Sequence, residues 1–100
     1  MALFAVTTTQ APVGISADEF RRRLPQGYAY MLDLIEKGVI VHSWIRVGKS
    51  GGLSIFDVAS HEELMLALYG NPISPHLEFG ITPLAETGAF DPNDLPSAPE

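Results

Sequence analysis

The spacing of apolar positions divides the chain into six segments with two periodicities. Residues 3–9, 39–47, 53–58 and 76–82 are rich in strand-forming residues or alternate between two sides, which is typical of β-strands. Between them, two segments carry apolar side chains at helical spacing and are bounded by capping residues. The order is strand, helix, strand, strand, helix, strand. That order predicts an α+β, ferredoxin-like βαββαβ fold, with four antiparallel strands and two helices on one face of the sheet.

The second helix has the clearest ends. The Ser60 hydroxyl can accept from the backbone N–H of Glu63, and the Glu63 carboxylate can reach back to the Ser60 N–H. At the other end, Gly70 can adopt the left-handed conformation, and Pro72 prevents the helix from resuming. We therefore expect a helix between Ser60 and Gly70.

The first helix has a similar start but an interrupted middle. Ser16 and Glu19 form a second capping box, and Gly38 is expected to end the helix. Inside it, Pro25 lacks an N–H to donate, and Gly27 costs about 1 kcal/mol relative to alanine. The sequence therefore predicts a kink or a break between residues 24 and 28.

The second and fourth strands predict what each face of the sheet carries. Four residues of the second strand are expected to pack under the helices: Val39, Val41, Ile45 and Val47. The opposite row holds Ile40, His42, Trp44 and Arg46, and His76 and Glu78 of the last strand should share that face. Such a bare face is normally covered by another subunit, so we expect a homo-oligomer.

Composition and charge narrow the class of protein. The 100 residues carry a net charge of −6, which disfavours nucleic-acid binding, and contain no cysteine. No apolar run approaches the roughly 18 residues of a membrane span, so we expect a cytoplasmic protein with no membrane contact. Residues 1–84 form the expected domain, and residues 85–100 an acidic, proline-rich tail whose apolar anchors are Phe90 and Leu95.

No cofactor or metal motif is present. The three histidines lack the spacing of a metal site, and there is no nucleophile elbow, phosphate loop or dinucleotide fingerprint. The arginine run 21–23 is either a solvated helix face or a site for an anion. What remains is a cofactor-free pocket on the bare sheet face, where histidine, arginine and glutamate suit proton abstraction and anion binding. The alternative is that His42 and Trp44 pack at an interface, with Arg46 and Glu78 as a cross-strand ion pair.

A set of residues spread from the second strand to the last one matches a known family pattern. The set consists of Gly38, His42, Trp44 and Gly48, then Ser54 to Val58 (SIFDV) with Ser60 and Leu64, then Pro72, Pro75 and the ending Thr82-Pro83-Leu84. With this pattern the chain resembles the muconolactone delta-isomerase family, which includes 5-chloromuconolactone dehalogenases. The resemblance implies a ferredoxin-like fold, dimers assembled into a decamer, and a cofactor-free site between subunits. It also implies a reaction that moves a proton within an unsaturated lactone.

One departure from that family affects the expected chemistry. The resemblance places the family's proton-shuttling glutamate at Gly27, and a lysine that usually follows it at Tyr28. Glycine has no side chain that can accept or donate a proton, so muconolactone itself is not the expected substrate. We expect either an isomerase-like enzyme for another small unsaturated lactone or carbonyl compound, or a non-catalytic oligomeric binding or scaffold protein. The catalytic candidates are His42, Glu78, His76 and Tyr28, and the substrate-binding candidates are Arg46, Trp44 and Phe56.

Overall fold

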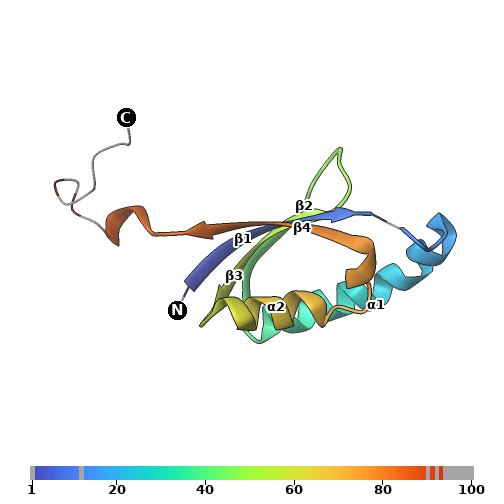
Figure 1. Ribbon diagram of the computed structural model, residues 1–100, viewed down its shortest axis with the longest axis horizontal. Helices are drawn as coiled ribbons and strands as arrows, with labels where there is room; N and C mark the ends of the chain where they lie inside the picture. Colours follow the sequence, from blue (N-terminus) through green and yellow to red (C-terminus); the bar gives the residue numbers. More distant parts are fainter. Residues whose placement is uncertain (1, 12, 90, 92, 94–100) are drawn as a thin grey trace.

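A computed structural model of the chain describes residues 2–11, 13–89, 91 and 93. The strands are β1 (Ala2–Gln10), β2 (Ile40–Ile45), β3 (Gly52–Val58) and β4 (Leu77–Leu84). The helices are α1 (Ala17–Glu36) and α2 (His61–Tyr69), with short 3₁₀ turns η1 (Ser74–His76) and η2 (Thr87–Ala89). Both α-helices lie on one side of the sheet, below it in Figure 1. The predicted ferredoxin-like α+β fold is confirmed.

The sheet runs in the order β2-β3-β1-β4 and is antiparallel at every pairing. Because opposed residues of paired strands share a face, the register assigns each side chain to the helix side or to the bare side. Phe4 pairs with Phe56 and Val6 with Ile81, and this row faces the helices. The buried core is made of Phe4, Val6, Leu34, Ile40, Phe56, Val58, Leu64 and Leu68.

The facing predicted for β2 is wrong at its first residues, and Val47, which was expected to pack under the helices, lies beyond the end of the strand and is fully exposed. Ile40 is 1% exposed and belongs to the core, whereas Val41 is exposed. The cause is a register shift: Ile40 pairs with Phe56, but His42 pairs with Ile55, so one extra residue is accommodated at Val41. After this bulge the pattern predicted for His42 and Trp44 holds, and both lie on the bare face.

Helix α1 is continuous through Pro25, so the predicted break is wrong. A proline inside a helix removes one donor, here the one that the Arg21 carbonyl would accept from. Both residues are exposed, so solvent can reach that carbonyl. Tertiary packing of Phe20, Gly27 and Leu34 along the buried side then keeps one helix where the local signals favoured two.

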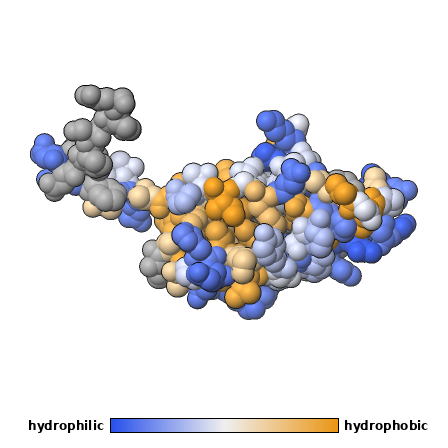
Figure 2. All heavy atoms as spheres, in the orientation of Figure 1, coloured by the Kyte–Doolittle hydropathy of each residue, from blue (hydrophilic) through white to orange (hydrophobic). Residues whose placement is uncertain are grey.

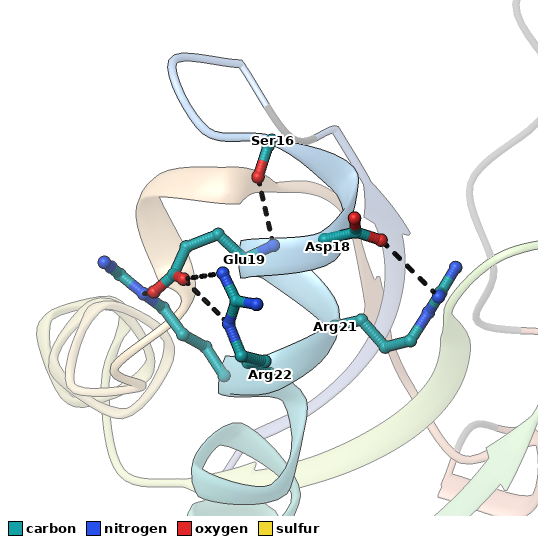
Figure 3. A network of polar contacts seen from close by, with 6 residues as sticks. Ser16, Asp18, Glu19, Arg21 and Arg22 are labelled. Carbon is teal, nitrogen blue, oxygen red and sulfur yellow. Dashed lines mark hydrogen bonds and ion pairs between the residues drawn. The ribbon is translucent and has the colours of Figure 1, made fainter.

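The start of α1 is fastened by a polar network (Figure 3). The Ser16 hydroxyl accepts from the Glu19 N–H at 3.1 Å, as predicted. The Glu19 carboxylate does not complete the box, because it accepts from Arg22 and Arg23 instead. These hydrogen bonds hold the pKa of Glu19 below its usual range. With Arg21 paired to Asp18 at 3.7 Å, the arginine run is a solvated, internally paired helix face.

Helix α2 begins where predicted but differs at both ends in detail. Ser60 accepts from the Glu63 N–H at 3.2 Å, while the Glu63 carboxylate accepts from the Ala59 N–H at 2.9 Å rather than from Ser60. Gly70 is right-handed, with φ −71°, so the predicted left-handed conformation is wrong. Its missing side chain instead leaves room for the Tyr30 hydroxyl, which a Cβ on Gly70 would strike.

The Tyr30 hydroxyl ties the two helices together. It donates to the Ala67 carbonyl at 2.7 Å, satisfying one of the carbonyls that the end of α2 leaves without a partner.

Neither helix of the described residues has the length and hydropathy needed to cross a bilayer. The tail anchors Phe90 and Leu95 lie outside the described residues, and the division at residue 84 stays a prediction.

Candidate functional site

A cleft of about 1030 Å³ opens between α1 and the helix-facing side of the sheet. Its walls come from α1, from both strands of the β2–β3 hairpin and from the segment that joins α2 to β4. Most of the lining is apolar: Leu24, Met31, Leu32, Ile35, Ile45, Phe56, Leu68, Ile73, Leu77 and Phe79. A concave, mainly apolar surface with a few polar groups is the usual form of a small-molecule site.

Two serine hydroxyls lie on the sheet side of this cleft. Ser43 and Ser54 pair across β2 and β3, and their hydroxyl oxygens are 2.9 Å apart. Ser54 is buried among the core residues, so this hydrogen-bonded pair is the polar feature of an otherwise apolar wall. The sequence analysis missed it, because a serine within a strand carries no signal until the register places it opposite a second one.

Two cations and two tyrosines add to the polar lining. Arg21 of α1 and Lys49 of the β2–β3 hairpin border the cleft, and both are exposed. Tyr28 borders it from α1 and is 58% exposed, so its phenol is free to meet a ligand. Tyr30 is partly buried, and this desolvation raises the pKa of its phenol. Tyr30 therefore stays a neutral donor, engaged with α2.

Three of the predicted site residues line the cleft: Tyr28, Trp44 and Phe56. Phe56 does so from the core. Trp44 borders the cleft from β2, but its indole stacks on the His42 ring, with centroids 5.6 Å apart and planes 8° apart. Since His42 and Trp44 pair with Ile55 and Leu53, this stack lies on the bare face, away from the helices.

The other predicted residues do not gather in one place within a subunit. Glu78 lies on β4 and His42 on β2, the two edges of the sheet, so three strand spacings of roughly 14 Å in total separate their strands. The two strands are therefore not adjacent, which also separates Glu78 from Arg46 just after the end of β2. His76 belongs to η1, where its Nδ1 lies 3.2 Å from the Val13 carbonyl oxygen and its ring meets Phe20 edge-on.

Arg46 is occupied by the backbone around it. One terminal nitrogen donates to the carbonyls of Thr8 and Ser50 and to the Thr9 hydroxyl. These bonds hold the β2–β3 hairpin against β1, and no ion pair with Glu78 is formed among the described residues. Within one subunit, Arg46 thus connects β1 to the β2–β3 hairpin by hydrogen bonds. Anion binding by its guanidinium stays a prediction.

A second hollow, of about 510 Å³, lies between α2 and β4. Its lining includes Leu64, Met65, Phe79 and Ile81, and apolar atoms gather at the middle of the face seen in Figure 2. His61 also lines this hollow, and its ring packs edge-on against Phe4. Across residues 2–11, 13–89, 91 and 93, no three metal-ligating side chains come together.

Fold and cleft together define a class: a ferredoxin-like α+β protein with a mainly apolar cleft between its first helix and its sheet. The chain belongs to the muconolactone delta-isomerase family, whose model matches residues 1–89. A muconolactone delta-isomerase of Rhodococcus opacus is 32% identical over 90 residues, which cover 89% of this chain and 97% of the relative. The enzyme of the same name from Cupriavidus pinatubonensis is 40% identical over 58 residues, 58% of this chain and 63% of that protein.

Solved structures show the same fold. The crystal structure of a muconolactone isomerase superposes with a TM-score of 0.74 at 24% identity, covering 98% of this chain and 99% of the other. A 5-chloro-2-hydroxyhydroquinone dehydrochlorinase from Burkholderia phenoliruptrix, in complex with 2,5-dihydroxybenzoquinone, gives a TM-score of 0.64 at 15% identity. It covers 89% of this chain and 99% of the other. The predicted family is confirmed.

Proposed function

We propose that this chain is a cofactor-independent, isomerase-like enzyme that moves a proton within an unsaturated lactone or a related carbonyl compound, in the cleft between α1 and the sheet. The observation that carries the proposal is the cleft itself, which is apolar enough for a small ring and bordered by Tyr28, Arg21 and Lys49. Membership of an isomerase family supports the type of reaction.

The roles of these groups follow from their chemistry. Moving a proton beside a carbonyl requires an acid–base group within about 3 Å of the carbon and a stabiliser for the charge on the oxygen. Among the described residues, the lining contains no carboxylate and no imidazole, and Tyr28 is the one predicted catalytic residue that borders the cleft. In this proposal the Tyr28 side chain is the acid–base group: the proton leaves one carbon, the electron pair moves into the conjugated carbonyl, and a proton returns at another carbon. Lys49 and Arg21, which border the cleft, supply positive charge that can stabilise the negative charge developing on the carbonyl oxygen.

A second copy of the chain is part of the proposal. The rim of the cleft carries apolar side chains that are more than two-fifths exposed, namely Leu32, Ile35 and Ile45, and the His42–Trp44 stack is bare. Exposed apolar groups gathered in this way mark an interface. We therefore expect a homo-oligomer, either a dimer or dimers assembled into a decamer, in which a neighbouring subunit covers the rim and the site lies between subunits.

One observation favours a different function. At residue 27, in the middle of the helix that lines the cleft, there is no side chain, and Ile73 packs against the backbone there. A chain without an acid–base group at that wall fits a binding or scaffold protein that keeps the fold without the chemistry. This alternative predicts that lactones bind but are not converted.

The Tyr28→Phe variant separates the two functions, with Tyr69→Phe as a matched control. Tyr69 is similarly exposed, but it lies on α2 and does not border the large cleft. For an enzyme, proton NMR of a panel of unsaturated lactones should show turnover that falls roughly 10²- to 10⁴-fold in Tyr28→Phe and is unchanged in Tyr69→Phe. Equal turnover in both variants would exclude Tyr28, and binding with no turnover by the wild type would establish the alternative.

A further inference from the structure

The inner wall of the cleft is shaped by an unusually close contact between α1 and the loop after α2. Gly27 is buried within α1, and a Cβ at this position would lie 2.6 Å from Ile73 Cδ1 and 2.8 Å from Ile73 Cγ1. Real Cβ atoms do not approach other carbons so closely. Ile73 therefore occupies the space that a side chain at residue 27 would need, and both residues line the cleft.

Asn71 holds Ile73 in this place. Its side-chain oxygen accepts from the Ile73 N–H at 3.0 Å, and its side-chain nitrogen lies 3.4 Å from the Gly27 carbonyl oxygen, to which it donates. Asn71 is buried, and its backbone carbonyl accepts from the Ser74 N–H at 2.9 Å. The turn that carries Ile73 is thus fastened to α1 at residue 27, and Ile73 is only 5% exposed. A side chain held this firmly forms a wall of defined shape.

The chemistry of this wall is apolar. Gly27 offers no side chain, Ile73 offers only hydrocarbon, and both side-chain polar atoms of Asn71 are engaged with backbone groups. We propose that Ile73 is a specificity-determining residue of the cleft: it limits the size of an apolar substituent on the bound substrate. This inference rests on the proposed function, since it assumes that the cleft binds the substrate.

The test measures the size limit directly. The probes are α,β-unsaturated γ-lactones with γ-alkyl chains from methyl to pentyl, and binding to the full-length protein is followed by isothermal titration calorimetry. In the wild type, affinity should rise with chain length and then fall steeply, by roughly tenfold or more for the first carbon that does not fit. Ile73→Ala should move this limit to longer chains, by up to about the three carbons that the substitution removes, and Ile73→Val by about one.

Ile81→Ala is the matched control. It removes the same atoms, but from β4, where Ile81 does not line the cleft, so it should not move the limit. If Ile73→Ala does not fold, Ile73→Val decides alone, because it removes a single carbon. An unchanged limit in the folded Ile73 variants, or an equal shift in Ile81→Ala, would overturn the inference while leaving the proposed function in place. A wild type that binds none of these lactones would overturn both.

Discussion

The substitution Gly27→Ala sets two opposing effects against each other in one residue. In an isolated helix, replacing an interior glycine by alanine stabilises by about 1 kcal/mol. Here the new Cβ would lie 2.6 Å from Ile73 Cδ1 and 3.1 Å from the Asn71 side-chain oxygen, so both residues would have to move. Overpacking of this kind typically costs about 1–3 kcal/mol. The net expectation is a loss of up to about 2 kcal/mol, against the direction of helix propensity.

A double-mutant cycle with Ile73→Ala isolates the steric effect. Ile73→Ala alone should destabilise by about 2–5 kcal/mol, because it empties a buried site. In that background the clash with Ile73 is gone, so Gly27→Ala should become neutral or stabilising by up to about 1 kcal/mol. The two substitutions should therefore be coupled by about 1–3 kcal/mol. The nearby exposed Gln26→Ala, within the same helix, serves as the control and should change stability by less than about 0.5 kcal/mol.

The assay is urea unfolding followed by circular dichroism, at one fixed protein concentration because the protein is expected to be oligomeric. The free energy of unfolding is compared across the four members of the cycle. If Gly27→Ala stabilised the wild type and the Ile73→Ala variant by the same amount, residue 27 would have free space beside it. The contact between α1 and Ile73 would then not exist in solution.

Three further outcomes are expected. His42→Ala should leave lactone turnover within about threefold of the wild type, because His42 lies on the face opposite the cleft. The same variant should weaken the oligomer in sedimentation velocity. Abolished turnover would instead place the site on the bare face, as the sequence predicted. Tyr30→Phe should flatten the loss of stability at alkaline pH. Because the folded pKa of Tyr30 is raised, its contribution to folding stability is complete below the unfolded pKa of about 10 and is lost as pH rises through the folded pKa. Identical alkaline unfolding curves for the wild type and Tyr30→Phe would contradict this assignment. Light scattering at micromolar concentration should show a mass well above the 10.8 kDa of one chain, and a stable single chain would remove the proposed interface.

The elements and their order were predictable because their signals are local. The capping serines Ser16 and Ser60 each act within one helical turn, and both accept from the N–H three residues later, as their spacing indicated. The fold class then followed from the order of segments. The prediction of a break at Pro25 was wrong because it used local signals alone. The buried side of α1 packs against the rest of the fold, and a local sequence pattern does not contain that packing.

The site was harder to predict because its parts are far apart in the sequence. Ser43 and Ser54 meet only through the register of β2 and β3, and Gly27 meets Ile73 across 46 positions of chain. The alternation of β2 misplaced Ile40, because a one-residue bulge has no signature in a run of β-branched residues. The positions of the histidines predicted a site on the bare face of the sheet. The cleft instead lies on the helix side of the sheet and is bordered by Tyr28.

The central claim is that the cleft performs proton transfer on an unsaturated lactone, and deuterium incorporation tests it most directly. The wild-type protein is incubated in D₂O with a panel of unsaturated lactones that includes muconolactone, and the carbon-bound protons are followed by NMR. The account predicts saturable, protein-dependent deuterium incorporation beside the carbonyl of at least one lactone, with muconolactone exchanged very slowly or not at all. Lactone binding without exchange in any member of the panel would contradict the claim, and so would rapid exchange of muconolactone, which the chain should not support with glycine at residue 27.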